Sequence, residues 1–374
     1  MNIHVLSTAY PLRGGIAHYV ALLVDALRQR HAVRVSTFKR QYPAFLFPGT
    51  SQEEGGPEGA TTPAPQIMDS VNPFNWIAVG LQLRREKPDL IIFKYWLPFF
   101  GPCFGTIAAI ARTNGHTRVL IVCDNVIPHE RRPGDILFTR YLLRFSDHFI
   151  VQSKIVEKDL LSLAPRARYQ LVAHPIYNSF GTPLKKDEAR TQLGITESRV
   201  LLFFGYIRRY KGLHVLLEAF ARLPKESNTR LLVVGEYYDD ASEYQKQIEH
   251  LGIADRVTVV GRYVPNDEVR VFFSAADAVI LPYLSATQSG IAQIAFHFET
   301  PVIYTDVGGL GETVRDGVHG MVVPPNDPAA LTRAISAFYD QDLHHAYSAN
   351  IRRDKHLFGW DTLVRAIEEL SEGR

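Results

Sequence analysis

The sequence predicts an α/β protein made of two doubly wound domains with parallel sheets, on three observations. Short apolar runs alternate with segments of helical period along most of the chain, which is typical of parallel βα units. The 374 residues, 46% of them hydrophobic, are enough for two domains that each bury a core. The alternation stops once, between residues 174 and 189, and then restarts. We therefore expect an interdomain linker there.

The first half contains five predicted strands, each a short apolar run. They cover residues 3–6, 33–38, 90–93, 119–122 and 149–151. Between the first two strands, Ile16, Val20, Leu23 and Leu27 share one face of a helix. Residues 42–65 are rich in Gly, Pro, Ser and Thr and are predicted to be a loop.

The second half repeats the pattern of strand followed by helix. Strands are predicted at residues 200–204, 231–234, 257–260, 278–281 and 302–304, and helices at 213–223, 242–251, 267–275 and 291–298. No short internal repeat is visible, which argues against a solenoid.

Composition and charge exclude several classes of protein. The 41 Lys and Arg residues nearly balance 39 Asp and Glu, and the basic residues are spread along the chain, so no nucleic-acid partner is expected. Cys103 and Cys123 are too few for a disulfide scaffold and have no zinc-like spacing. The N-terminus lacks the features of a signal peptide, and the longest apolar stretch, residues 97–111, is too short to span about 30 Å of hydrocarbon. We expect a cytoplasmic protein without a transmembrane helix.

Two glycines and a group of cations follow predicted strands. Gly14 and Gly15 open a helix, where free N–H groups can meet an anion, although a tight turn without a ligand explains them equally well. Their spacing is not GxGxxG, which argues against a nicotinamide dehydrogenase. In FFGYIRRYKG, Gly205 is followed by Arg208, Arg209 and Lys211 at the end of a strand, where fixed cations suit a diphosphate.

A second helix start that suits an anion lies later in the chain. Ser289 and Gly290 precede a predicted helix, and Gly308 and Gly309 follow the next strand. Together with the cationic loop, these features predict one site for a nucleotide diphosphate.

Three segments, in this order, resemble motifs of the retaining glycosyltransferases of family four. GGIAHYV is similar to the glycine-rich loop of their N-terminal domain, and FFGYIRRYKG to the loop that supplies an Arg and a Lys to the donor diphosphate. GGLGETVRDGVHGMVVPPNDPAAL is the most specific match. The resemblance covers nearly the whole chain and implies the GT-B fold, in which two Rossmann-like domains face each other across a cleft.

The resemblance implies a hexosyltransferase that uses a nucleotide diphosphate sugar and retains the anomeric configuration. The acceptor would be a glycan, a lipid-linked molecule or a small molecule. We assign residues 1–177 to an acceptor-binding domain and 178–355 to a donor-binding domain. Residues 356–374 would form a helix that packs back on the first domain, anchored by Phe358, Trp360, Leu363 and Ile367.

Site residues carry over one by one. Lys211 matches the family lysine, and Arg208 is assigned as the arginine, with Arg209 as the alternative because Tyr206 stands where many members have Arg. The usual pair of glutamates eight positions apart is missing from SATQSGIAQIAF. Gln288, Ser289 and Gly290 remain there to bind phosphate, while Glu236 and Glu312 are the acids left to hold hydroxyl groups.

In the N-terminal domain, His129 and then Asp124 are the candidates for the family's histidine that contacts the sugar or the reacting centre, and loop capping is the alternative role for each. Asp340 and Asp342 form one DxD triplet at a predicted helix end, where solvated surface is the preferred interpretation. The sequence and the resemblance therefore predict no metal and no cofactor besides the donor.

Two features bear on the acceptor. The aromatic group Tyr95, Trp96, Phe99, Phe100 and Phe104 is interpreted first as core and second as a stacking surface for a sugar or a lipid. Arg131, Arg132, Arg140 and Arg144 recur around ILFTRYLLRF, and this segment could lie on an anionic membrane surface.

Two other functions stay open at this stage. One is a sugar-nucleotide epimerase of the same fold, and the other is a noncatalytic nucleotide-binding or scaffold protein.

Overall fold

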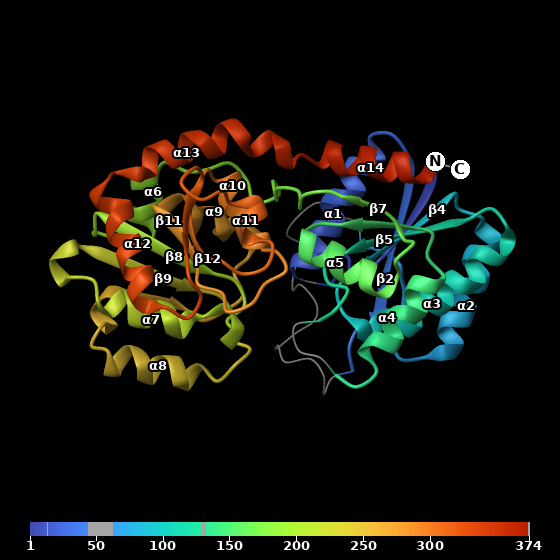
Figure 1. The fold of residues 1–374 in the computed structure, drawn as a ribbon, viewed down its shortest axis with the longest axis horizontal. Coiled ribbons are helices and arrows are strands. Elements are labelled where there is room, and N and C mark those ends of the chain that lie inside the picture. The colour runs from blue at the N-terminus through green and yellow to red at the C-terminus, as the bar shows by residue number, and fades with distance from the viewer. Residues whose placement is uncertain (13, 44–62, 129–131, 373–374) are drawn as a thin grey trace. The chain divides into compact units, whose positions relative to one another are not determined.

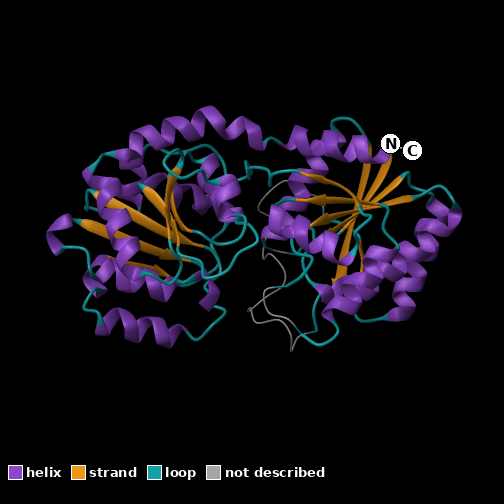
Figure 2. Ribbon diagram, viewed as in Figure 1, coloured by secondary structure: helices purple, strands orange, loops and turns teal. Residues whose placement is uncertain are grey.

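Two compact units are formed by the residues that the computed structural model describes, which are 1–12, 14–43, 63–128 and 132–372. Unit 1 comprises Met1–Pro175 and Gly359–Arg374, and unit 2 comprises Ile176–Phe358 (Figure 1). In each unit one sheet lies between layers of helices, and Figure 2 shows this arrangement for both. We expected the boundaries after residues 177 and 355.

Unit 1 contains a seven-stranded parallel sheet in the order β3-β2-β1-β4-β5-β6-β7. Its strands are β1 (Asn2–Leu6), β2 (Ala32–Arg40), β3 (Gln66–Asp69), β4 (Leu90–Tyr95), β5 (Arg118–Cys123), β6 (His148–Val151) and β7 (Arg168–Leu171). The helices are α1 (Gly15–Arg28), α2 (Pro73–Glu86), α3 (Gly101–Ala111), α4 (Asp135–Arg144), α5 (Lys154–Leu163) and, from the C-terminus, α14 (Trp360–Glu372). The direction of winding reverses between β1 and β4, so the loops after these strands flank the place where open α/β sheets bind ligands.

Unit 2 contains a six-stranded parallel sheet in the order β10-β9-β8-β11-β12-β13. Its strands are β8 (Arg199–Phe204), β9 (Thr229–Val234), β10 (Val257–Val260), β11 (Ala278–Leu281), β12 (Val302–Thr305) and β13 (Gly320–Val323). Its helices are α6 (Lys186–Gln192), α7 (Leu213–Ala221), α8 (Ala241–His250), α9 (Asn266–Ala275), α10 (Gly290–His297), α11 (Leu310–Thr313), α12 (Pro328–Asp340) and α13 (Leu343–Asp354). Here the winding reverses between β8 and β11, which pair through Leu201 with Ala278 and Leu202 with Val279.

The strands that we did not predict lie at sheet edges. β3 and β7 are the outer strands of unit 1, and β13 is an outer strand of unit 2. β7, with the sequence RYQL, is partly exposed along its whole length, whereas central β4 is buried at every position. β7 therefore lacks the continuous apolar run that reveals a central parallel strand.

The predicted linker is partly helical. Helix α6 begins at Lys186, inside the segment 174–189 in which we expected no regular structure. Asp187 and Glu188 occupy its first turn, where negative charge stabilises a helix N-terminus. The polar residues that suggested a linker thus form the start of a helix.

The aromatic group after β4 belongs to the core of unit 1. Tyr95, Phe100 and Phe104 are fully buried, and Trp96 and Phe99 pack against them. The Trp96 and Phe100 rings lie 4.5 Å apart, and those of Phe99 and Phe100 lie 5.1 Å apart. The interpretation as core is confirmed for the three buried rings.

The C-terminal helix α14 packs on α1 within unit 1. The rings of Tyr19 and Trp360 lie 5.0 Å apart, and Arg30 pairs with Glu368 at 3.1 Å. Leu363 and Ile367 are fully buried in this helix. Phe358 differs from our expectation, because it belongs to unit 2, where its ring lies 5.5 Å from that of Phe296.

Candidate active site

The loop after β8 brings a lysine ammonium group to the start of a helix. Gly205 has a φ of 104°, and a Cβ atom there would lie 3.2 Å from Lys211 Nζ and 3.2 Å from Ile291 Cδ1. Gly205 therefore leaves room for the ammonium group beside the first turn of α10. Gly205, Lys211 and the first turn of α10 meet at the point where the winding of the unit 2 sheet reverses.

The surroundings of Lys211 disfavour its charged form. Burial, followed by the nearby positive charge of Arg208, lowers the pKa of Lys211 to about 8. The ammonium group also lies 5.7 Å from the centre of the Tyr283 ring. Both causes of the shift disfavour the cation, so a bound anion would stabilise its charged form.

Arg208 and Arg209 point to different surroundings. The Arg208 guanidinium group lies 4.8 Å from the centre of the Tyr238 ring, and Tyr238 in turn stacks on Tyr206 at 4.5 Å. Arg209 is exposed and lies 4.0 Å from Glu243, an exposed residue of α8. Of the two arginines, Arg208 is the one whose charge acts on Lys211.

The start of α10 is capped by Ser289. Its hydroxyl group accepts a hydrogen bond from the Ala292 N–H at 3.4 Å and lies 3.3 Å from the Tyr283 hydroxyl oxygen. Gly290 approaches Tyr177 so closely that a Cβ atom would lie 3.1 Å from the Tyr177 ring. Gln288 directly precedes this cap.

The double glycine after β12 packs against the segment that leads into α10. A Cβ atom on Gly308 would lie 1.6 Å from the Ala286 carbonyl oxygen, and the Gly309 N–H donates to the Thr287 carbonyl oxygen at 3.0 Å. Glu312 follows in the single turn of α11 and is exposed. The glycines thus join the two loops that the sequence placed at one site.

The loop after β9 approaches the loop after β8. The Ile207 N–H donates to the Glu236 carbonyl oxygen at 2.8 Å, and the Glu236 side chain is buried. Gly235 makes this approach possible, because a Cβ atom there would lie 2.0 Å from the Gly205 carbonyl oxygen. Glu236 is therefore placed by its backbone beside the loop that carries Arg208 and Lys211.

In unit 1, Asp124 pairs with a buried lysine that the sequence analysis did not single out. Lys94 Nζ lies 2.5 Å from Asp124 Oδ1 and donates to Gln152 Oε1 at 3.0 Å. It also lies 3.4 Å from the centre of the Tyr19 ring. Lys94 is only 1% exposed, and burial lowers its pKa, while Asp124 opposes that effect. A lysine inside the apolar strand LIIFKY is the signal that could have revealed this pair.

The remaining sequence candidates in unit 1 are placed only in part. Gly14, with a φ of 107°, caps α1, and Gly15 is exposed at its first position, with no atom within 4 Å of an added Cβ. His129 lies outside the described residues. Within the described part of the chain, no group of three His, Cys, Asp or Glu side chains is arranged to hold a metal ion. Metal-independent chemistry stays a prediction.

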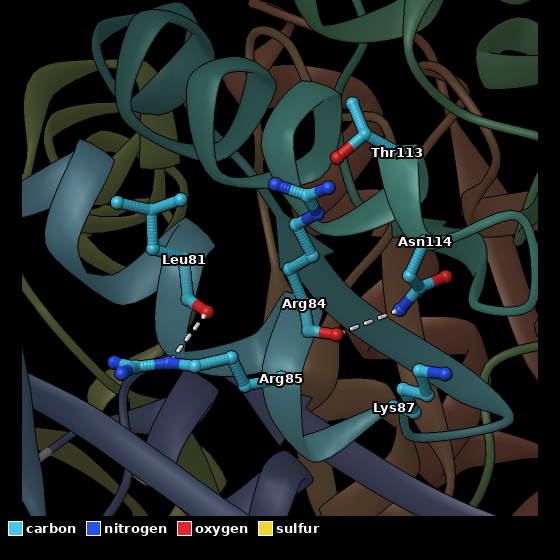
Figure 3. Close-up of a pocket in the computed structure, with 6 residues that line it drawn as sticks. All are labelled: Leu81, Arg84, Arg85, Lys87, Thr113 and Asn114. Carbon is cyan, nitrogen blue, oxygen red and sulfur yellow. Dashed lines mark hydrogen bonds between the residues drawn. The ribbon is translucent and has the colours of Figure 1, made fainter.

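A pocket in unit 1 lies at the amino ends of the strands, opposite the end where ligands bind to open α/β sheets. It has a volume of about 720 Å³ and is lined by Leu81, Arg84, Arg85, Lys87, Thr113 and Asn114 (Figure 3). These residues stand before β4 and β5, at the amino ends of the strands. The pocket is therefore not part of the candidate active site.

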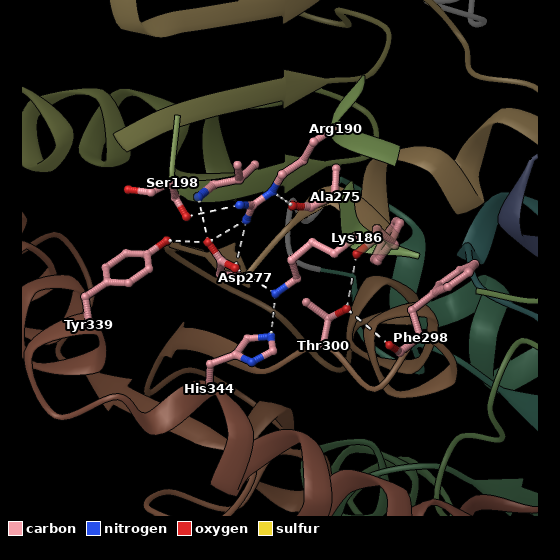
Figure 4. Close-up of polar contacts among 11 residues, drawn as sticks. Lys186, Arg190, Ser198, Ala275, Asp277, Phe298, Thr300, Tyr339 and His344 are labelled. Atoms are coloured by element: carbon pink, nitrogen blue, oxygen red, sulfur yellow. Dashed lines mark hydrogen bonds and ion pairs between the residues drawn. The ribbon is translucent and has the colours of Figure 1, made fainter. Parts of the chain in front are cut away.

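A polar cluster around Asp277 likewise lies at the amino edge of the unit 2 sheet (Figure 4). The Asp277 carboxylate accepts hydrogen bonds from Arg190 at 2.9 and 3.0 Å, from Lys186 at 2.8 Å and from the Val200 N–H at 2.7 Å. Because these contacts join α6 to the start of β8, the cluster stabilises the fold.

No helix in the described residues is long and apolar enough to cross a membrane.

Comparison with known proteins identifies the family. The model of glycosyl transferases group 1 matches residues 185–354, and that of Glycosyltransferase Family 4 matches residues 13–177. D-inositol 3-phosphate glycosyltransferase 1 of Catenulispora acidiphila is 33% identical over 299 residues, which are 74% of this chain and 70% of that protein. The D-inositol 3-phosphate glycosyltransferase of Mycolicibacterium smegmatis is 31% identical over 91% of this chain and 79% of that protein.

Solved structures show the same fold. Sucrose-phosphate synthase from Thermosynechococcus elongatus superposes with a TM-score of 0.76 at 22% identity, covering 99% of this chain and 98% of that one. Anabaena HepE in complex with UDP has a TM-score of 0.76 at 18% identity, with 99% of each chain covered. The fold is GT-B, and the chain belongs to the family four glycosyltransferases.

Proposed function

We propose that this glycosyltransferase moves a hexose from a nucleotide diphosphate sugar to an acceptor and retains the anomeric configuration. The observation that carries the proposal is the meeting of Lys211, Gly205 and the first turn of α10 where the winding of the unit 2 sheet reverses. Unit 2 would hold the donor, and unit 1 would hold a glycan, lipid-linked or small-molecule acceptor.

The chemistry that these residues supply is stabilisation of the leaving group. Breaking the anomeric bond builds negative charge on the diphosphate, and preorganised cations and N–H groups offset this charge in the transition state. Lys211 and Arg208 would contact the diphosphate, together with Gln288 and the helix start at Ser289 and Gly290.

Acids near these loops would hold sugar or ribose hydroxyl groups. Glu236 is buried beside the loop after β8, and Glu312 follows the double glycine. In unit 1, Asp124, kept beside Lys94, would accept a hydrogen bond from a sugar hydroxyl group, and His129 would serve the reacting centre. Gly14 and Gly15 would let a ligand approach the first turn of α1.

UDP is the nucleotide to test first, because HepE was solved with UDP and with UDP-glucose. A nucleotide that binds only the folded protein raises its stability by about 2.7 kcal/mol at 100 times the dissociation constant. UDP, ADP and GDP should be compared by thermal shift. If none of them, nor any of their sugar conjugates, raises the melting temperature at millimolar concentration, the donor site is misplaced.

Transfer should then depend on Lys211 and Arg208. A hydrogen bond to a charged group contributes about 1.5–3 kcal/mol, so Lys211→Met and Arg208→Met should each slow transfer about ten- to a hundredfold. Arg209→Met is the matched control, because Arg209 is exposed beside Glu243. Full activity of Lys211→Met would contradict the assignment.

Product analysis separates the proposed function from its alternatives. Mass spectrometry of candidate acceptors, inositol phosphate among them, should show an added hexose, which neither an epimerase nor a noncatalytic protein produces. NMR of the new glycosidic bond gives its anomeric configuration. An inverted product would contradict retention without contradicting transfer.

A further inference from the structure

The outer side of one helix layer in unit 1 carries most of the exposed apolar side chains of the described chain. Among the residues that the structure describes, eleven large apolar ones are exposed, and seven of these lie on or beside α2 and α4. We call these seven the apolar face: Val71, Phe74, Ile77, Leu81, Leu137, Phe138 and Tyr141. Phe74 is 83% exposed and Leu137 is 68% exposed. Large exposed apolar surfaces mark sites where a protein contacts a partner or a membrane.

The apolar face consists of one row of side chains on or beside α2 and a second row on α4. Both helices belong to one layer. α2, α3 and α4 follow strands whose connections all run in the same direction across the sheet, so right-handed crossovers place them on the same face. α3 packs between the other two, and Figure 1 shows the three side by side. Gly101 and Gly105 allow α4 to lie close to α3, since a Cβ atom on Gly101 would lie 2.4 Å from the Phe138 carbonyl oxygen.

Each row points away from the core. Phe74, Ile77 and Leu81 are spaced for one side of α2, while Val79 and Leu83 form its buried side. On α4 the residues Leu137, Phe138 and Tyr141 are exposed, whereas Thr139, Leu142 and Leu143 are buried. Side chains of the described core therefore do not cover the apolar face.

Positive charge accompanies the apolar face. The exposed cations of residues 71–87 and 132–145 are Arg84, Arg85, Lys87, Arg132, Arg140 and Arg144. The same stretches contain two acids, and both are engaged. Glu86 lies 3.7 Å from His4 and 3.6 Å from Arg34, and the Asp135 carboxylate accepts a hydrogen bond from the Arg132 N–H at 2.7 Å. Helix α3 between them carries no charged residue.

Cations also line the pocket at the end of the α2 row. Arg84, Arg85 and Lys87 surround it beside Leu81, without an acid among its lining residues (Figure 3). This chemistry suits a phosphate group that lies next to an apolar surface.

We propose that unit 1 docks through α2 and α4 on the surface of an anionic lipid bilayer. The seven apolar side chains would enter the boundary between headgroups and acyl chains, and the six cations would meet lipid phosphates. A symmetric contact with a second copy of the chain is disfavoured, because it would bring the same six cations face to face. The proposal goes beyond transferase activity and does not depend on it.

Sedimentation of the full chain with vesicles tests the proposal. The chain should sediment with vesicles that mix phosphatidylglycerol with phosphatidylcholine, should not sediment with phosphatidylcholine alone, and should be released by salt. Each cation near such a surface contributes about fivefold in affinity, so Arg84→Ser combined with Arg85→Ser should weaken binding roughly thirtyfold. Arg222→Ser combined with Arg333→Ser, two exposed cations of unit 2, is the matched control.

The apolar contribution has its own variant and control. Phe74→Ser should weaken vesicle binding roughly ten- to a hundredfold. Leu357→Ser, which changes a 57% exposed residue of unit 2, should leave binding unchanged. Each variant should keep the melting temperature of the parent chain, because the altered side chains are exposed.

Three outcomes would overturn the proposal. They are absence of sedimentation with both kinds of vesicle, equal binding to both kinds, and binding that neither the arginine variant nor Phe74→Ser weakens. A fourth would assign the face to a second copy of the chain, namely a concentration-dependent dimer that Phe74→Ser dissociates without any vesicle binding. None of these outcomes bears on transfer to a water-soluble acceptor.

Discussion

Replacement of Lys94 by Met should strongly destabilise unit 1. The Lys94 side chain is 1% exposed and its ammonium nitrogen lies 2.5 Å from an oxygen of Asp124, so the substitution removes the buried cation of this pair. Removing one partner of a buried ion pair costs about 3–5 kcal/mol. For a unit of this size, 1 kcal/mol lowers the melting temperature by about 2–4 °C, so we expect a decrease of roughly 6–20 °C.

A double-mutant cycle separates the ion pair from simple loss of packing. Asp124→Asn alone should also destabilise unit 1, because it leaves the buried ammonium group beside a neutral amide. Combining Lys94→Met with Asp124→Asn removes both charges, and replacing a whole buried pair is often nearly neutral. The double variant should therefore be more stable than the sum of the single changes predicts.

Calorimetry of the four chains measures this coupling, with Arg209→Met as a surface control in unit 2. Additive effects, or a loss below about 1 kcal/mol for Lys94→Met, would refute the reasoning. Transfer activity adds an independent measurement. If Asp124 contacts a sugar hydroxyl group, the double variant should fold and remain impaired in transfer.

Two further predictions concern stability. Asp277→Asn should cost about 3–5 kcal/mol because it removes the anion that Arg190 and Lys186 share, whereas Glu243→Gln at an exposed pair should stay within about 0.5 kcal/mol in the same urea titration. Burial and the Lys94 charge lower the pKa of His174 to about 3. Below pH 6.5 the imidazole therefore binds a proton in the unfolded chain while it stays neutral in the folded chain. The contribution of His174 should therefore lower the free energy of unfolding by about 2 kcal/mol between pH 7 and pH 5. His174→Gln should reduce the measured pH dependence of that free energy by the same amount.

The central strands could be predicted because each is a short run of apolar residues, which indicates a buried strand. β4 and β8 are mostly apolar on both faces, because helices cover both faces of a parallel sheet. The edge strands β3 and β7 could not be predicted, since their mixed sequences, QIMD and RYQL, become strands through the neighbour that pairs with them.

The same distinction applies to the site. Gly205 and Lys211 could be found because the glycine, the cation and the strand end lie within a few residues of one another. The choice between Arg208 and Arg209 depends on Tyr238 and Glu243, which come from other parts of the chain. Sequence reasoning left that choice open because both partners are distant in sequence.

Lys94 of unit 1 and Lys211 of unit 2 differ in how their charge is balanced. Lys94 is buried with a carboxylate at 2.5 Å, so the folded chain itself compensates its ammonium group. The pKa of Lys211 falls to about 8 because burial and another cation both act against its charge. A bound anion would supply the missing negative charge and stabilise the ammonium form of Lys211. This contrast favours Lys94 as a positioning residue for Asp124 and Lys211 as the group that meets the donor diphosphate.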